Sequence, residues 1–226
     1  RMPPKHAATY FKMEKQQVLD YQRAKARGTV SAIHAAALRM KLLQIASGAV
    51  YGDNVLEEDL KARPVHTIDT GRYELVMDLA CESPHSLVLF LWQHQRDELV
   101  RLAETRKLRY AVLDGSTKDA VRSTIEMQYQ AGMFDVLIAH PKTVAHGLTL
   151  TRGTTTIWAS PTDDTEWFKQ GGRRQARRGQ TQVTRVITVV AEGTVDERAY
   201  ANCTEKGDRE DAFLGLFAQY TLEEAA

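Results

Sequence analysis

Cysteine is scarce in this sequence of 226 residues, and the scarcity excludes a fold held together by disulfides. Cys81 and Cys203 stand far apart and in no metal-ligand spacing, and lone thiols of this kind are typical of a reducing, intracellular compartment. No apolar run approaches the length of a membrane span and no signal peptide is visible, so we expect no membrane association. The chain begins with Arg1 and not with Met, and we expect it to be part of a longer protein.

A phosphate-binding loop is missing as well. The Walker loop requires two glycines at a fixed spacing followed by Lys and then Ser or Thr, and no segment has that pattern. The segment 114–118 reads DGSTK and is only a turn by this criterion. No acidic box for a metal follows an apolar strand either. We therefore predict no metal site, and we expect this chain alone to hold neither ATP nor Mg²⁺ in the usual way.

Charge of one sign is not in excess overall, because 30 basic residues oppose 29 acidic ones. Basic character is local, and it is strongest in 170–180, which reads QGGRRQARRGQ. Four arginines fall within six residues there, with no carboxylate between them: Arg173, Arg174, Arg177 and Arg178. Such a cluster repels itself and is typical of a site that meets an anion. A solvated basic helix, or a non-specific patch for polyanions, is the alternative.

The residues around the arginines predict a helix that runs through them. Acidic residues precede the cluster and Gly179 follows it, which suits the dipole and the usual end of a helix. On that helix Arg174 and Arg177 are neighbours three apart, but Arg173 and Arg177 are four apart, and so are Arg174 and Arg178. Spacing alone therefore gives a basic face and does not choose the working pair.

Strands and helices alternate from residue 86 onward. Short apolar runs such as 87–91 are typical of strands buried on both faces. The alternation predicts an α/β fold, a parallel sheet covered by helices on both faces, with an N-terminal helical extension and C-terminal helices. The expected strands are 87–91, 110–113, 135–139, 155–159 and 183–190, and the expected helices are 9–27, 31–46, 71–81, 95–106, 117–131, 195–205 and 211–220.

Ligands of such sheets bind beyond the carboxyl ends of the strands. The segments that meet there are 93–94, 114–117, 140–149 and 160–165. The Gly-Ser-Thr turn within the second segment offers enough N–H and hydroxyl donors for one phosphate of a nucleic-acid strand. His140 and His146 of the third segment lack a third metal ligand, which favours a role as polar loop residues.

The order of these segments resembles the second RecA-like lobe of superfamily 2 helicases, specifically the Swi/Snf-related DNA translocases, and is closest to compact bacterial or phage members. Segment 87–93 looks like the fourth motif of that family, LDGST at 113–117 with Arg122 looks like the next element, and VLIAHPKTVAHGLTL at 136–150 looks like the fifth motif. The sixth motif is matched by Gln170, Arg174, Arg177, Gly179 and Gln180.

The resemblance covers nearly the whole chain and implies its organisation. Residues 1–68 would form the helical inter-lobe segment and a connector, 69–207 the RecA-like lobe, and 208–226 a C-terminal helix with an acidic tail. It also implies a cytoplasmic protein, in the host cell if the protein is viral.

The same resemblance implies a division of labour around ATP. The first lobe, outside this chain, supplies the phosphate loop and the Mg²⁺ site, and the second lobe supplies arginines to the γ-phosphate. The implied catalytic residues are Arg174 and Arg177, and those near ATP are Gln170, Gly147 and Thr149. The implied contacts to the DNA backbone, which would be sequence-tolerant, are Gln93, Ser116, Lys142 and Thr143.

The expected activity is thus that of a DNA-dependent ATPase in the two-lobed protein, with negligible hydrolysis by this chain alone. A non-catalytic nucleic-acid-binding or adaptor domain that kept the fold is the alternative, and an unrelated flavodoxin-like binding protein is the third. A Walker lysine upstream in the full-length protein would separate the first two.

Overall fold

A computed structural model describes residues 1–26, 32–52, 64–145 and 147–204 of the chain, which forms two compact units. One contains Arg1–Asp69 together with the chain from Ala191 onward, and the other is Thr70–Val190. Residues 191–204 thus fall in the same compact unit as the N-terminal helices. The expected division at 1–68, 69–207 and 208–226 stays a prediction. The predicted segment 208–226 and the helix expected at 211–220 lie outside the described residues.

The first unit contains helices and a small hairpin. Helix α1 spans Pro4–Ala26, α2 spans Ala32–Ala46, and α8, Val195–Thr204, packs against α2. The buried hydroxyl of Tyr10 donates to Glu14 and accepts from the N–H of Val195 at 2.9 Å, which joins α1 to the start of α8.

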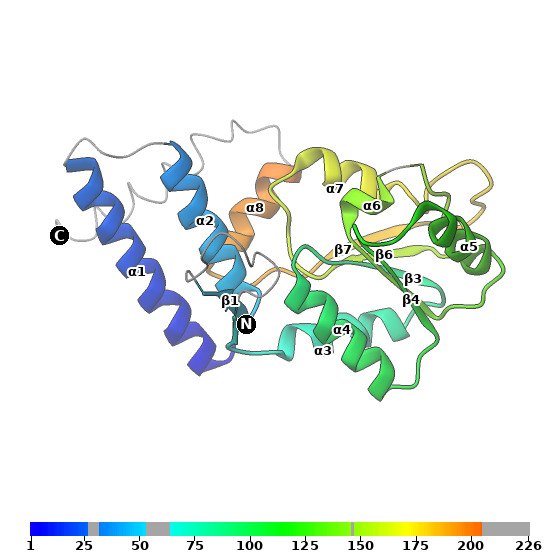
Figure 1. Cartoon of the computed structure of the whole chain (residues 1–226), viewed down its shortest axis with the longest axis horizontal. Helices are drawn as coiled ribbons and strands as arrows, with labels where there is room; N and C mark the ends of the chain where they lie inside the picture. Colours follow the sequence, from blue (N-terminus) through cyan, green and yellow to red (C-terminus); the bar gives the residue numbers. More distant parts are fainter. Residues whose placement is uncertain (27–31, 53–63, 146, 205–226) are drawn as a thin grey trace. The chain divides into compact units, whose positions relative to one another are not determined.

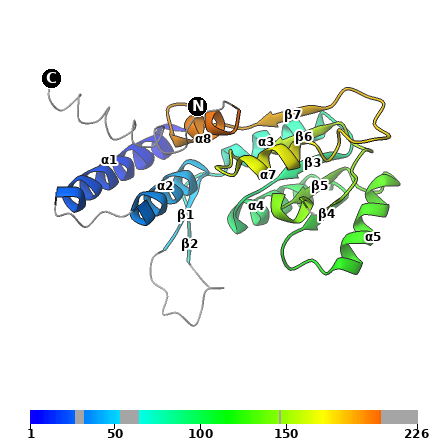
Figure 2. The same cartoon turned by 90° about the horizontal axis from the view of Figure 1, so that it is seen from above.

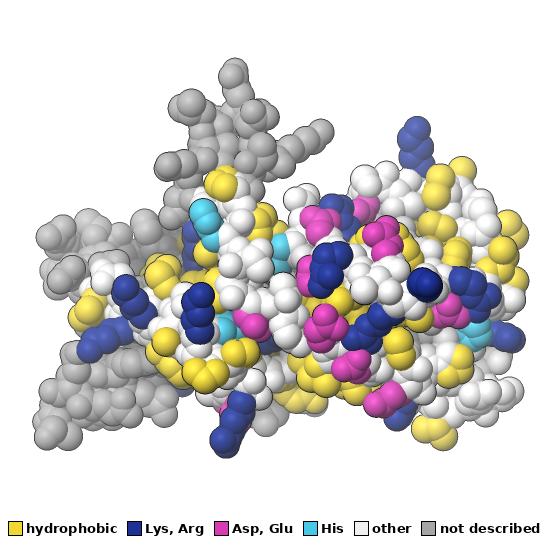
Figure 3. Space-filling view, turned by 90° about the horizontal axis from the view of Figure 1, so that it is seen from below, with side chains coloured by type: hydrophobic (Ala, Val, Ile, Leu, Met, Phe, Trp, Pro, Cys, Tyr) yellow, Lys and Arg dark blue, Asp and Glu magenta, His cyan; other side chains and the backbone are white. Residues whose placement is uncertain are grey.

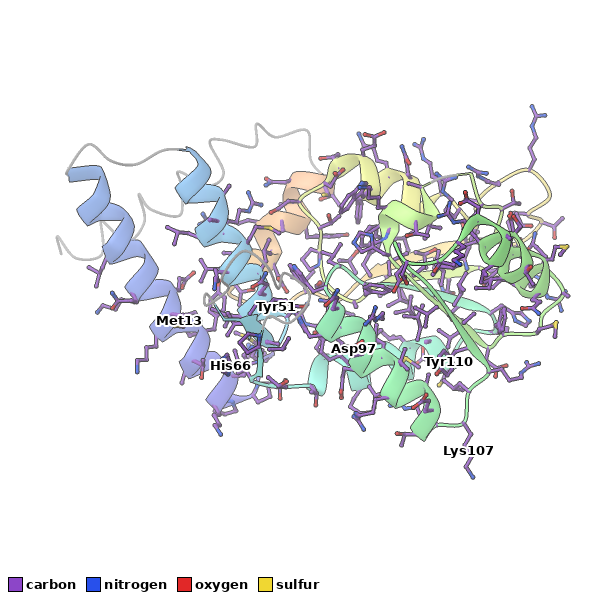
Figure 4. The ribbon with its side chains drawn as sticks, viewed as in Figure 1. Met13, Tyr51, His66, Asp97, Lys107 and Tyr110 are labelled. Carbon is purple, nitrogen blue, oxygen red and sulfur yellow. The ribbon has the colours of Figure 1, made fainter. Side chains whose placement is uncertain are left out.

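The hairpin of this unit lies within residues 1–68, which the sequence assigns to helices and a connector and not to strands. Strand β1, Ala49–Tyr51, pairs antiparallel with β2, Val65–Thr67. Figure 4 labels one residue of each strand, Tyr51 and His66. All three residues of β2 are exposed, so the strand has no buried face. It therefore lacks the alternation of apolar and polar residues that predicts a strand from sequence.

The second unit is built on a parallel sheet whose described strands are ordered β4-β5-β3-β6-β7. The central strand, β3, pairs Val88 with Ile138 on one side and with Ile157 on the other. The sheet confirms the predicted parallel arrangement, and the more exposed fifth strand lies at its edge. The bounds are Ser86–Leu89 for β3, Tyr110–Leu113 for β4, Val136–Ala139 for β5, Thr155–Trp158 for β6 and Arg185–Thr188 for β7.

Helices cover both faces of this sheet, as predicted. Figure 1 shows α3, Gly71–Cys81, and α4, Gln93–Thr105, on one side of the strands. The other side carries α5, Asp119–Gln130, α6, Pro141–Val144, and α7, Thr165–Gly172, and Figure 2 looks down on that side. Successive residues of a strand serve opposite faces, so Val88 packs with α3 and α4 whereas Leu89 packs with the other helices.

Helix α7 lies close to the strands because Gly171 faces them. A Cβ atom added there would stand 2.9 Å from Leu89 Cδ1 and 3.0 Å from Trp158 Cζ2. A larger residue there would require the fully buried side chains of Leu89 and Trp158, or the helix itself, to shift.

Two local predictions are wrong. The arginines do not lie on a helix: α7 ends at Gly172, and the N–H groups of Arg173 and Arg174 bond three residues back, to Gln170 and Gly171. Two adjacent glycines weaken the helix at that point, so its last turn tightens and the chain leaves it. The helix expected to begin at Thr117 begins at Asp119 instead, and the Thr117 hydroxyl accepts from the N–H of Asp114 at 3.0 Å.

The surface over α3 and α4 carries intermingled acidic and basic side chains (Figure 3). Arg106 pairs with Glu74 and Asp78, each at 2.7 Å, and Arg101 pairs with Glu98. Opposite charges compensate one another on this face, as on an ordinary solvated surface. None of the described helices is both long and apolar enough to cross a membrane.

Candidate functional site

Three of the predicted DNA-contact residues lie at the carboxyl edge of the sheet. Gln93 is the exposed first residue of α4 and follows β3, Ser116 follows β4, and Lys142 follows β5. These strands are neighbours in the sheet, so the ends that carry the three residues meet at one edge. Thr143, the fourth predicted DNA contact, differs from these three because it is buried, with only 4% of the residue exposed. Its side chain is therefore not accessible at the surface.

The turn that carries Ser116 is closed by its own carboxylate. Both the N–H and the hydroxyl of Ser116 donate to Asp114 Oδ1, and Arg96 Nη1 donates to Asp114 Oδ2 at 2.9 Å. Burial raises the pKa of Asp114, but the bonds from Ser116 and the Arg96 guanidinium outweigh it and leave that pKa below its usual value. The donors that the sequence offered to a phosphate are therefore directed at Asp114.

His140 acts as a cap and a packing residue. Its Nδ1 accepts from the N–H of Lys142 at the start of α6, and its ring meets Phe90 and Trp167 edge-on at 5.7 and 5.4 Å. Burial, assisted by the charge of Lys142, lowers its pKa and favours the neutral ring. His146 lies outside the described residues. Within the described part of the chain, no three His, Cys, Asp or Glu side chains come together as metal ligands.

Arg174 and Arg177 both turn toward the segment that follows α6. Arg174 Nη2 donates to the carbonyl of Ala145 at 2.8 Å, and Arg177 Nη1 donates to the carbonyl of Gly147 at 2.9 Å. Both residues lie in the stretch 173–180, which we name the arginine loop. Arg173 and Arg178, in contrast, are exposed. The structure thus separates the four arginines into a converging pair and two surface residues.

The Arg174 guanidinium is buried and only partly bonded. The residue is 5% exposed, and its Nε and Nη1 have no hydrogen-bond partner in the described structure. Burial, followed by the positive charge of Arg177, lowers its pKa. A buried cation with unsatisfied donors beside a second cation is a favourable place for an anion.

Two of the three residues predicted near ATP touch this pair. Gln170 Oε1 accepts a long bond, 3.5 Å, from Arg174 Nη2, and Gln170 Nε2 donates to Glu166. Gly147 supplies its carbonyl to Arg177 and has a φ of 88°, which favours glycine. Thr149 is placed differently, since its N–H donates to Glu126 of α5 at 2.6 Å.

Two glutamines that hold the arginine loop were not among the predicted site residues. Gln180 was matched only as part of a motif, yet its Nε2 lies within bonding distance of the carbonyls of Thr151, Gly153 and Gln175. Gln175 is fully buried although its neighbours Arg173 and Ala176 are exposed. Nothing in the local sequence distinguishes Gln175, because its partners come from distant parts of the chain.

A solved structure shares this architecture. The crystal structure of the C-terminal part of the Fun30 ATPase domain superposes with a TM-score of 0.74, covering 96% of this chain and 93% of that one, at 16% sequence identity. The fold is RecA-like. At this level of identity the likeness concerns the fold alone.

Sequence comparison adds one relative and no family model. Putative protein p41 of Acyrthosiphon pisum secondary endosymbiont phage 1 is 28% identical over 219 residues, which is 94% of this chain and 44% of that protein. The chain therefore spans less than half the length of this curated relative. No family model matches the chain.

Proposed function

We propose that this chain is the C-terminal motor lobe of an ATP-dependent DNA translocase or helicase. Its RecA-like fold, shared with the C-terminal part of an ATPase domain, supports this proposal. The convergence of Arg174 and Arg177 on one backbone segment is the observation that carries it. In this proposal ATP is shared with an N-terminal RecA-like lobe of the same protein, to which we assign the phosphate loop and the Mg²⁺ ligands.

The arginine pair suits a phosphoryl group. Arg174 has two buried nitrogens without a partner, and Arg177 is partly exposed. Both would then be available to a phosphate brought by the other lobe. A guanidinium keeps its charge and presents parallel donors, so it stabilises the charge that develops on phosphate oxygens during hydrolysis. Such an arginine is worth on the order of 10³-fold or more in rate. Gln170, Gly147 and Thr149 would border the nucleotide.

The carboxyl edge of the sheet would hold the DNA. Gln93 and Lys142 are exposed there, with Lys142 between Gln93 and the Ser116 turn, and Thr143 would have to become accessible to take part. Contacts of this kind address phosphates and carry no sequence information, so binding should tolerate any sequence and weaken with salt. ATP binding and hydrolysis would close and open the two lobes and move the protein along DNA, in the cytoplasm of the cell that contains it.

The test is a matched pair of substitutions in a protein that carries both lobes. Arg177→Ala should reduce the rate of ATP hydrolysis by about 10³-fold and leave DNA affinity within about twofold, because only the proposed finger is lost. Arg178→Ala removes an exposed charge from the same loop and should leave hydrolysis nearly unchanged. Equal hydrolysis by both variants would contradict the assignment and favour the non-catalytic adaptor.

The isolated chain offers a second measurement. We expect it to bind DNA weakly and to hydrolyse ATP negligibly, because half of the proposed nucleotide site belongs to the other lobe. DNA-stimulated turnover by this chain alone would contradict the proposal.

A further inference from the structure

The arginine loop has no regular secondary structure, so something else must hold it. Its backbone makes a bond to the neighbouring segment where the N–H of Leu150 donates to the carbonyl of Arg174 at 3.2 Å. The bonds from Arg174 and Arg177 to backbone carbonyls do not fix the loop, because long arginine side chains can keep such bonds when the loop backbone shifts. A loop that presents catalytic groups must be kept in place by residues that do not themselves react.

Gln175 is the most deeply buried residue of this loop. It is 0% exposed, and its amide is bonded at both ends. Oε1 accepts from the Thr156 hydroxyl of β6 at 3.0 Å, and Nε2 donates to the Tyr129 hydroxyl of α5 at 3.0 Å. A buried amide with both ends satisfied fixes one geometry, because any displacement leaves a buried donor or acceptor unpaired.

Tyr129 completes this link from the other side. It is 0% exposed, and its hydroxyl donates to the backbone carbonyl of His85 while it accepts from Gln175. Burial raises its pKa to about 12, although the bond from Gln175 lowers it, so the hydroxyl keeps its proton near neutral pH. The segment before β6 closes over the pair: a Cβ at Gly153 would stand 2.6 Å from Gln175 Nε2 and would overlap the Tyr129 hydroxyl.

The helix that carries Tyr129 also holds the segment between β5 and β6. Glu126 accepts from the N–H of Thr149 at 2.6 Å, and Gln130 Oε1 accepts from the N–H of Arg152 at 2.9 Å. The segment that supplies the carbonyls for Arg174 and Arg177 is thus held by the same helix as the arginine loop. That helix, α5, begins two residues after the turn of Asp114 to Thr117.

We propose that Tyr129 and Gln175 are positioning residues that fix the arginine loop in advance, so that Arg174 and Arg177 meet an anion without reorganising. The catalytic meaning of this inference rests on the proposed function, whereas the ordering of the loop is a property of this chain alone. Neither residue touches the reacting atoms. Both act through the two arginines.

Amide hydrogen exchange on this chain tests the ordering. Tyr129→Phe keeps the ring and removes only the hydroxyl, and Gln175→Ala removes the amide. In both variants we expect the hydrogen-bonded amides of Leu150, Arg174 and Gln180 to exchange about tenfold faster, while those of strand β3 stay as in the parent protein. Gln182→Ala, at an exposed glutamine nearby, is the matched control and should change neither set.

The outcomes are separable. Unchanged exchange rates of the loop amides would overturn the inference, and so would an equal rise in the exchange rates of the β3 amides. In either case Tyr129 and Gln175 would not order the arginine loop specifically. In the two-lobed protein Tyr129→Phe and Gln175→Ala should lower kcat about 10-fold to 10²-fold with KM nearly unchanged. If the loop loosens but hydrolysis persists in these variants and in Arg177→Ala, the ordering stands and the proposed function fails. If Arg177→Ala abolishes hydrolysis while a loosened loop does not lower kcat, the positioning role fails.

Discussion

Gln95 Nε2 donates to Ser160 Oγ at 2.7 Å, and the two residues are 0% and 1% exposed. The same amide accepts from the N–H of Leu91 at 2.7 Å through its Oε1. One buried side chain thus ties the loop after β3, which leads to Gln93, to the chain that follows β6.

Gln95→Ala should therefore lower the free energy of unfolding by about 2–3 kcal/mol. The substitution leaves the buried Ser160 hydroxyl and the part-buried Leu91 N–H without their partner. Urea denaturation measures the change, and Gln93→Ala, two residues away and exposed, should stay within about 0.5 kcal/mol of the parent. Equal stabilities of the two variants would show that the buried amide has no structural importance.

Gly153→Ala should destabilise the protein severely, by about 3 kcal/mol or more. Its Cβ would overlap the His85 carbonyl oxygen, a backbone atom that cannot move aside as a side-chain tip can. Gly115→Ala is the matched control, because no atom beyond the two adjacent residues lies within 4 Å of the added Cβ, and stability should change by less than about 1 kcal/mol. Thermal unfolding of both variants measures the difference in stability. A small loss of stability in Gly153→Ala would mean that the segments before β3 and β6 can move apart to accept the methyl group.

His94 should make stability depend on pH between 6.5 and 4. Burial lowers its pKa from 6.5 to about 4, against the raising effect of Asp97, so in this range the unfolded chain binds a proton that the folded chain does not. The contribution is complete above pH 6.5 and is lost as the pH falls toward 4, by about 3 kcal/mol in total. His94→Phe, which keeps a ring against Trp92, should flatten the profile over this range. An equally steep fall in that variant would assign the dependence to other groups.

Lys142 should contribute one phosphate contact to DNA binding. Lys142→Gln in the two-lobed protein should weaken binding for all sequences alike and reduce the slope of log affinity against log salt by about 0.9. Lys107→Gln is the control, because Lys107 is exposed in the turn before β4, at the opposite edge of the sheet, where Figure 4 labels it with Tyr110. Titrations by fluorescence anisotropy at several salt concentrations measure both slopes. Equal slopes in the two variants would remove Lys142 from the interface.

The sheet and its helices were predictable because their signals are local. The runs SLVL and VLIA are buried at every position, so they stand out as apolar segments without reference to the rest of the chain. The bounds of α3 and β4 agree with those expected from apolar spacing and flanking turns. The β1–β2 hairpin gave no such signal, because its strands are short and one is fully exposed.

The candidate site was predictable in its residue types but less so in its geometry. The family resemblance selected Arg174 and Arg177 from the four arginines. Their burial and hydrogen bonds now separate this pair from the exposed Arg173 and Arg178. The role of the pair in catalysis stays a prediction. Helical spacing failed for the loop since Gly171 and Gly172 end the helix first. Gln175 could not be found, because Thr156 and Tyr129 are 19 and 46 residues away.

The missing side chain at Gly171 sets how far the arginines stand from the strands. A methyl group at that position would crowd Leu89 and Trp158, and any outward shift of α7 that relieves this contact would carry along the chain that leaves the helix one residue later. Arg174 lies three residues beyond this contact, so the packing of Gly171 inside the protein helps to set the height of Arg174 above the sheet. We therefore expect a related sequence with the same four arginines, but a bulkier residue at position 171, to hold those arginines at a different distance from the sheet.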